Sequence, residues 1–219
     1  MITRYTTVDD LPKQIPLFPL AGALLLPRTD LPLNVFEPRY LLMIEAAMAS
    51  ERIIGMIQPT PDDSSAKPKL EKIGCAGRIT SYSEAEDGRY LITITGICRF
   101  KLGREPKVQT QFRQGVVDYA PFAIDLVSGT GSPGVNREQL LEAFRQYLEA
   151  NNMSTNWDEV NAVNTEVLVN TLSLLAPYPP REKQALLEAP DLKSRAEVLV
   201  ALTELALKKS LGGNSTRMQ

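Results

Sequence analysis

The chain has 219 residues, of which 43% are hydrophobic and 23% are charged, and its 24 basic and 26 acidic residues give a net charge of −2. This composition is typical of a globular protein long enough to bury a substantial core without disulfide or metal staples. The sequence contains no histidine, which excludes Ser-His-Asp and Cys-His catalytic sites and zinc sites with imidazole ligands. The near-balance of charge also disfavours non-specific binding of nucleic acid.

The first part of the chain, residues 1–128, predicts a β-rich domain, because short apolar runs alternate there with prolines and turn residues. A surface loop rich in proline and aspartate is expected over residues 59–69. Before this loop we expect three proline-interrupted strands, one helix and a fourth strand, over Gln14–Phe18, Ala23–Leu26, Leu31–Phe36, Glu37–Arg52 and Ile53–Gln58 respectively.

The clearest β pattern follows, where Ile73–Ser83 and Arg89–Phe100 flank the hairpin signal Asp87-Gly88. Further strands are expected over Phe100–Arg104 and Phe112–Tyr119. Six or more short strands with one inserted helix predict a small closed or nearly closed barrel.

The two cysteines, Cys75 and Cys98, lie on either side of this hairpin. A two-residue turn would place Cys98 opposite Gly77 and Cys75 diagonally on the same face, about 7–8 Å away and too far for a relaxed disulfide. We therefore expect two small core thiols, with a redox-sensitive pair as the alternative. One extra loop residue would put the two cysteines on opposite faces of the sheet.

The second part, residues 129–219, predicts four helices in a compact bundle. The first helix follows the N-cap Asn136, the second covers Trp157–Leu175, the third covers Arg181–Ala189 and the last follows Asp191. A frayed tail is expected from Gly212 onward. The α+β order, mainly strands and then helices, thus predicts two domains, 1–128 and 129–219.

Two short motifs imitate catalytic or nucleotide-binding patterns. Gly129–Gly134 matches G-x-G-x-x-G, but only helices are expected after it and Pro133 lacks an N–H for phosphate, so we interpret it as a linker. Ser64 and Lys67 match S-x-x-K in a polar loop that would keep the lysine solvated and charged. From the sequence as a whole we expect no catalytic residue, no cofactor and no metal ion.

The apolar run from Ile15 to Leu26 is too short to cross a bilayer, and prolines interrupt it. We expect a cytoplasmic protein that does not bind membranes.

The candidate binding residues are Phe36, Arg39, Tyr40 and Tyr178. The first three surround Glu37-Pro38 at a strand-to-helix junction. One interpretation is structural, in which Arg39 ties the helix to the barrel through a bidentate ion pair; the other is ligand contact by the two aromatics and the arginine. Tyr178 lies between prolines and is either part of a rigid connector or an exposed anchor.

Taken together, these segments resemble the N-terminal domain of Lon proteases, and more closely the bacterial proteins that consist of that domain alone. The matching segments are Ile15–Leu20, Leu24–Pro27, Leu31–Tyr40, Gly74–Ile79, Asp87–Tyr90, Gly96–Phe100 and Glu182–Glu188. The resemblance implies a PUA-like pseudobarrel followed by a helical bundle. It also implies a non-catalytic module that recognises unfolded or degron-bearing polypeptides, or a partner such as an ATP-dependent protease.

Because the ATPase and Ser-Lys protease modules of Lon are not expected in this chain, any peptidase activity would belong to the larger protein. The alternative function is RNA or nucleotide binding through the PUA-like barrel, which the local basic set Arg99, Lys101, Arg104 and Lys107 would support. The charge balance of residues 1–128 argues against that alternative, so nucleic acid is an unlikely partner.

Overall fold

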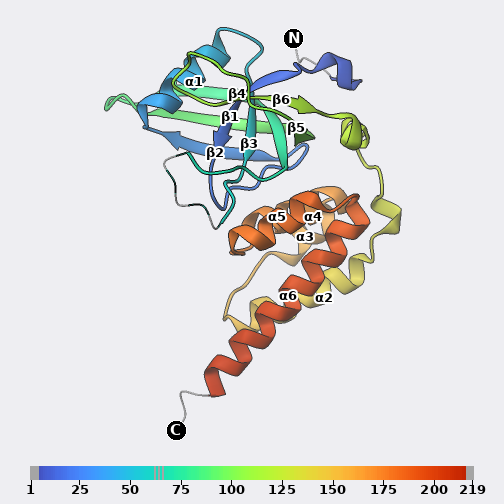
Figure 1. Cartoon of the computed structure of the whole chain (residues 1–219). Helices are drawn as coiled ribbons and strands as arrows, with labels where there is room; N and C mark the ends of the chain where they lie inside the picture. The colour runs from blue at the N-terminus through green and yellow to red at the C-terminus, as the bar shows by residue number, and fades with distance from the viewer. Residues whose placement is uncertain (1–4, 62, 64, 66, 216–219) are drawn as a thin grey trace. The chain divides into compact units, whose positions relative to one another are not determined.

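The computed structural model describes residues 5–61, 63, 65 and 67–215, the last six of them by their backbone alone. The chain forms two compact units (Figure 1). One comprises Met1–Ser128 and Tyr178–Leu187, and the other comprises Gly129–Pro177 and Glu188–Gln219. The boundaries between the units lie after Ser128, before Tyr178 and after Leu187, so the segment Tyr178–Leu187 belongs to the β-rich unit.

The first unit is a barrel with one long helix between its second and third strands (Figure 1). The strand order is β2-β5-β4-β3-β1-β6, and an additional pairing of β5 with β6 closes the ring. The elements are β1 (Gln14–Pro19), β2 (Asp30–Val35), α1 (Pro38–Met48), β3 (Ile53–Ile57), β4 (Ile73–Glu84), β5 (Tyr90–Leu102) and β6 (Gln114–Asp118), with short 3₁₀ helices η1 (Val8–Asp10) and η2 (Ala120–Leu126). The prediction of a six-stranded barrel within an α+β fold is confirmed.

Strand β5 closes the barrel because it is long enough to serve two neighbours on one edge. Its first half, Tyr90–Thr95, pairs with β2, and its last residues, Lys101 and Leu102, pair with β6. The expected separate strand over Phe100–Arg104 is therefore the end of β5. All pairings are antiparallel except that of β1 with β3.

The predicted strand Ala23–Leu26 is wrong, because this segment is a buried irregular loop. The loop lies directly on β5 at Gly96, where an added Cβ would be 2.0 Å from the Leu26 carbonyl oxygen. Gly96 also exchanges backbone hydrogen bonds with the loop, donating to Thr29 at 2.9 Å and accepting from Arg28 at 2.8 Å. The apolar run thus indicates that these residues are buried, and a buried segment can be either a strand or a loop.

The register of the β4–β5 hairpin is shifted by one residue from the register that a two-residue turn at Asp87-Gly88 would give. Glu84 pairs with Tyr90 and Ala76 pairs with Cys98, so Cys75 and Cys98 point to opposite faces of the sheet. Both thiols are free and buried. Burial raises the pKa of Cys98 to about 12, which keeps this thiol protonated and unreactive at neutral pH.

The barrel interior is filled by side chains that alternate along the strands, among them Ile15, Leu17, Ala76, Cys98 and Phe100. Two glycines make room for the Phe100 ring: a Cβ at Gly74 would approach it to 2.5 Å and a Cβ at Gly55 to 3.0 Å. The core of the barrel therefore depends on small residues facing one large ring.

The second unit contains α2 (Arg137–Ala150), α3 (Trp157–Ala162), α4 (Thr165–Leu175) and α6 (Leu192–Ser215), while α5 (Pro180–Glu188) falls mainly in the first. The expected single helix over Trp157–Leu175 is two helices, because the Asn164 side chain accepts from the Val167 N–H and starts α4 anew. Helix α6 continues through Gly212 to Ser215, and the rest of the predicted tail lies outside the described residues.

The glycine-rich segment before α2 forms a connection of turns. Gly129 and Gly131 have φ values of 75° and 82°, and the Gly129 N–H donates to the Glu166 carboxylate at 2.7 Å. Helix α2 follows, and no strand follows in the part of the chain that is described, so the βαβ context of a nucleotide site is missing. Among the described residues, no helix combines the length and apolarity needed to cross a bilayer.

Candidate functional site

A groove of about 730 Å³ opens on the first unit, where the first turn of α1 meets the loops over residues 59–69 and 103–113. Its lining includes four prolines, Pro19, Pro59, Pro68 and Pro106, and two aromatic residues, Tyr40 and Phe112. Because proline fixes its own backbone φ, these walls lose little conformational freedom when a ligand binds.

Tyr40 is held rigidly at the groove. Its side chain is only 7% exposed, and its ring packs on Phe18 with centroids 4.4 Å apart. Its hydroxyl donates to the Pro19 carbonyl at 3.3 Å, and the Arg39 guanidinium lies 4.5 Å from the ring centroid. Burial raises the pKa of Tyr40, so the phenol stays neutral. It therefore contributes an apolar surface with a fixed orientation.

Arg39 does not tie α1 to the barrel as the structural interpretation expects. It pairs with Glu37, two residues earlier, through Nε at 2.9 Å and Nη2 at 2.8 Å, and both side chains are about half exposed. The short sequence separation lets the pair form within the helix entry itself. Arg39 thus presents its charge at the groove, already partly neutralised.

Of the four predicted binding residues, the structure brings Arg39 and Tyr40 together in this groove. Phe36 is 66% exposed beside the same helix entry but does not line the groove. Tyr178 is half-buried and does not line it either.

Arg113 is a groove residue that the sequence analysis does not identify. It makes a bidentate pair with Glu105 at 2.7 and 2.5 Å and donates to the Pro68 carbonyl at 2.6 Å, so it joins the two loops. The hydrogen bonds from Arg113 lower the pKa of Glu105. An Arg and a Glu eight positions apart in irregular chain give no periodic signal, which is why only the folded chain reveals the pair.

The loop over residues 59–69 is ordered by Asp63. Its carboxylate accepts from the backbone N–H groups of Ser65 at 3.0 Å and Lys69 at 2.8 Å. The Ser65 side chain and then these N–H groups lower the pKa of Asp63 to about 2. This carboxylate is thus committed to its own loop. Ser64 of the S-x-x-K motif lies outside the described residues, and Lys67 is exposed at the groove.

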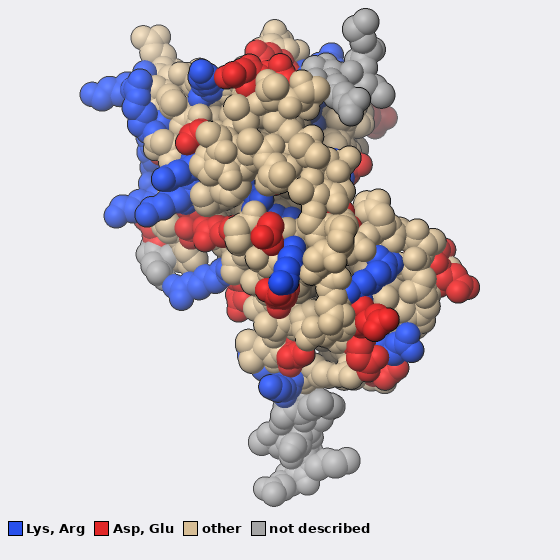
Figure 2. Space-filling view, turned by 90° about the vertical axis from the view of Figure 1, so that its right-hand side faces the viewer, with Lys and Arg blue, Asp and Glu red and all other residues tan. Residues whose placement is uncertain are grey.

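The lining of the groove carries four cations, Arg39, Lys67, Lys107 and Arg113, and one described anion, Glu105. Lys67 and Lys107 form no ion pair with a described residue. Figure 2 shows another aspect of the charge pattern: on the face it presents, basic and acidic side chains are interspersed, with basic ones gathered along one edge.

The described lining of the groove combines cationic, polar and apolar groups. Among the described residues, no three carboxylates or thiols lie close enough to hold a metal ion. The cations, the exposed Val108 and the proline walls are suited to extended chains with mixed polar and apolar side chains.

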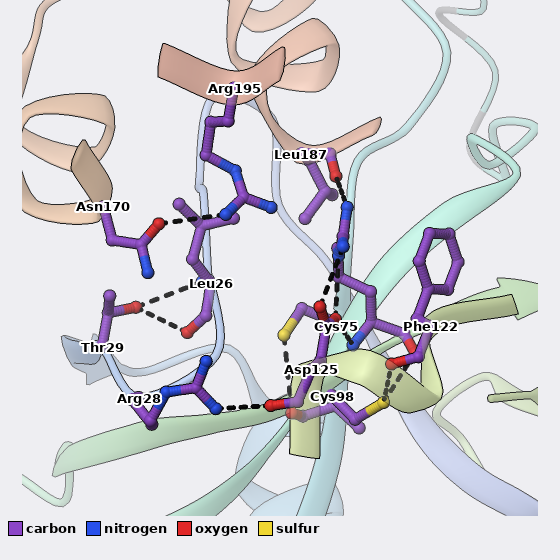
Figure 3. Close-up of polar contacts among 12 residues, drawn as sticks. Leu26, Arg28, Thr29, Cys75, Cys98, Phe122, Asp125, Asn170, Leu187 and Arg195 are labelled. Carbon is purple, nitrogen blue, oxygen red and sulfur yellow. Dashed lines mark hydrogen bonds and ion pairs between the residues drawn. The ribbon is translucent and has the colours of Figure 1, made fainter. Parts of the chain in front are cut away.

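A second polar cluster lies inside the first unit, around Asp125 (Figure 3). Arg99 donates to Asp125 from Nε and Nη2, each at 2.8 Å, and from its backbone N–H at 3.0 Å. Its Nη1 donates to the Leu187 carbonyl at 3.1 Å, and its guanidinium lies 4.5 Å from the Phe122 ring centroid. The carbonyls of the last helical turn have no partner within a helix, so Arg99 caps α5 while it fastens η2 to β5.

This cluster removes Arg99 from the predicted basic set. The residue is 1% exposed and its charge is matched by Asp125, which is 7% exposed, so it cannot contact nucleic acid. Lys101, Arg104 and Lys107 remain on the surface. The RNA-binding alternative thus loses one of the four residues that motivate it.

Two buried glutamines fix the start of α5 on the barrel. Gln58 donates to the Pro180 carbonyl at 3.0 Å and to the Gln184 side chain at 3.1 Å, and its own oxygen accepts from the Gly22 N–H at 2.8 Å. Gln184 donates in turn to the Ile73 carbonyl at 3.1 Å. These bonds explain why a segment distant in sequence belongs to the β-rich unit.

Residues 14–204 match the model of the ATP-dependent protease La (LON) substrate-binding domain. The chain belongs to this family. The match covers both units, and the resemblance inferred from the sequence motifs is confirmed.

Among curated proteins, the chain is 24% identical over 213 residues to Lon protease 2 of Myxococcus xanthus, covering 89% of this chain and 24% of that protein. It is 25% identical over 214 residues to the Lon protease of Flavobacterium johnsoniae, covering 93% of this chain and 26% of that protein. The chain therefore spans about a quarter of the length of these relatives.

Two solved structures share the fold. A Lon N-terminal domain protein from Xanthomonas campestris has a TM-score of 0.61 at 23% identity, with 86% of this chain and 97% of that chain covered. The N-terminal domain of the Mycobacterium avium complex Lon protease has a TM-score of 0.64 at 18% identity, with 88% and 98% covered. At these identities the likeness establishes the architecture.

Proposed function

We propose that this chain is a polypeptide-recognition module and that it binds its ligand in the groove beside Arg39 and Tyr40. The observation that carries the proposal is that groove itself, because two loops tied together by Arg113 and walled by prolines present apolar and cationic groups in a preformed shape. Membership of the substrate-binding domain family supports the choice of a polypeptide as ligand.

The ligands that we propose are unfolded or degron-bearing polypeptides, and the partner is an ATP-dependent protease that would receive them. In this role the chain acts as an adaptor and contributes no catalytic residue. A pull-down with the purified chain, followed by identification of a co-purifying ATPase–protease, tests the adaptor role separately from binding itself.

The binding experiment uses fluorescently labelled casein without ATP and follows its anisotropy as the protein is added. Val108 lines the groove and is 39% exposed, so Val108→Ser removes apolar contact without opening the core. We expect casein affinity to fall roughly threefold to tenfold, as for the loss of one partly buried branched side chain.

Val163→Ser is the matched control, because Val163 is 38% exposed, belongs to the second unit and does not line the groove. Its affinity for casein should equal that of the unmodified protein. Absence of casein binding at tens of micromolar would reject the proposed function, and an equal loss in the two variants would reject the groove as its site.

A further inference from the structure

The charge of the groove differs from that of the chain around it. The whole chain has a net charge of −2, whereas the described lining of the groove carries four cations and one anion. Two of the cations are committed, Arg39 to Glu37 and Arg113 to Glu105. The remaining positive charge comes from Lys67 and Lys107, which lie on the two loops that line the groove.

We propose that the occupant of the groove is an acidic, extended polypeptide segment whose carboxylates pair with Lys67 and Lys107. Its apolar side chains contact Val108 and the proline walls. This inference rests on the proposed function and adds to it the chemical class of the polypeptide.

Charge complementarity selects the occupant because neither lysine forms an ion pair with a described carboxylate, and Glu105, whose pKa the Lys67 charge helps to lower, is already paired with Arg113. A ligand carboxylate that enters the groove displaces water from a partly enclosed surface, where attraction between charges is stronger than in bulk solvent. The committed arginines do not compete for the ligand, since each already holds a carboxylate within 3 Å.

The aromatic residues of the groove favour a polypeptide over a nucleic acid. Single-stranded nucleic acids are held by exposed rings on which successive bases stack. Tyr40 and Phe112 are each only 7% exposed, so neither presents an open face. The groove therefore offers an anion the two lysines but offers a base no stacking platform.

The test uses three peptides of equal length and equal apolar content that carry Glu, Gln or Lys at alternate positions. We expect the Glu peptide to bind about tenfold more tightly than the Gln peptide at about 50 mM NaCl, and the Lys peptide to bind most weakly. The difference should shrink at about 300 mM NaCl because the lysines are exposed to solvent.

The double variant Lys67→Glu/Lys107→Glu should reverse this order and bind the Lys peptide most tightly. Its control is Lys13→Glu/Lys72→Glu, which makes the same change in net charge at two exposed lysines that do not line the groove. The control should keep the order of the unmodified protein, with at most about a twofold change in each affinity.

The outcomes separate the inference from the function on which it rests. Equal binding of all three peptides would overturn the acidic preference and leave the proposed function intact, whereas binding of none would overturn both. An RNA oligonucleotide that binds as tightly as the Glu peptide, and is lost in the groove double variant, would identify a general polyanion site and overturn the inference.

Discussion

The first unit contains arginine–carboxylate pairs of similar geometry in opposite surroundings. The side chains of Arg99 and Asp125 are 1% and 7% exposed, whereas those of Arg39 and Glu37 are 49% and 45% exposed. In the buried pair each charge has lost its water and depends on the partner, while in the exposed pair water can replace either side chain. The difference indicates that Arg99 fixes the architecture, whereas the Arg39–Glu37 pair contributes little to it.

The Arg113–Glu105 pair lies between these extremes, with side-chain exposures of 16% and 28%. It joins two loops and does not connect core elements, so its effect is on the shape of the groove. The three pairs form a series in which the cost of breaking the pair should follow burial.

The strongest test of this series is Arg99→Met, which leaves Asp125 buried without its cation. We expect the free energy of unfolding to fall by about 3–5 kcal/mol, as for other broken buried pairs. Urea denaturation followed by circular dichroism measures it. The double variant Arg99→Met/Asp125→Asn removes the unpaired charge and keeps a side-chain oxygen that accepts from the backbone N–H of residue 99. It should therefore be more stable than Arg99→Met alone. A loss below about 1 kcal/mol in Arg99→Met would contradict the structural role.

A smaller loss in the free energy of unfolding is expected for the buried hydrogen bonds of Gln58 and Gln184, because these side chains are neutral. Gln184→Leu deprives the Ile73 carbonyl of its side-chain donor and Gln58 of one acceptor, at a cost of about 1–3 kcal/mol. Gln146→Leu on the exposed face of α2 is the control and should change stability by less than about 0.5 kcal/mol. Equal effects of the two variants in the same denaturation experiment would show that α5 is not held by this network.

Arg113→Met tests the partly buried Arg113–Glu105 pair and should lower the free energy of unfolding by about 1–2 kcal/mol at neutral pH. Arg113 lowers the pKa of Glu105 in the folded protein below the ordinary value of 4.5. The ion pair therefore contributes its full stabilisation above pH 4.5, and this contribution is lost as the pH falls through the lowered pKa of Glu105. The stability difference between the variant and the unmodified protein should therefore be constant from pH 7 to about pH 5 and narrow at lower pH. A difference that widens on acidification would refute this assignment.

The smallest effect is expected for Arg39→Met, which breaks the exposed pair. Stability should change by less than about 0.5 kcal/mol, because both side chains return to water. A loss above about 1 kcal/mol in thermal or urea denaturation would mean that Arg39 has a structural role after all.

Local patterns predicted those parts of the fold that local interactions decide. The alternation on both sides of Asp87-Gly88 identified β4 and β5, and Asn136 identified the start of α2. Such patterns gave the wrong secondary structure where an apolar, buried stretch is not one continuous strand or helix. Leu24–Leu26 are buried in a loop, and Asn164 restarts a helix inside an apolar stretch.

The candidate site was only partly predictable for a related reason. Arg39 and Tyr40 were identified because aromatic and charged residues gather at one helix entry. Arg113, Lys67 and Phe112 reach the same groove from loops far away in sequence, and no spacing rule connects them. The sequence groups Arg99 with Lys101, Arg104 and Lys107, which follow it closely. Arg99 lies on the face of β5 opposite Cys98 and Phe100, and it is buried there because Asp125 of η2 and the Leu187 carbonyl of α5 cover it.

The sequence by itself determined that this chain has no histidine chemistry, that strands precede helices and that its motifs are those of the Lon substrate-binding domain. These properties depend on residue identity and on short-range order, which composition and periodicity report directly. Only the tertiary structure decided that Arg99 is a buried clamp, that α5 belongs to the barrel and that two loops form a cationic groove. The physical reason is that desolvation and ion pairing depend on which distant residues meet, and the folded chain alone brings them together.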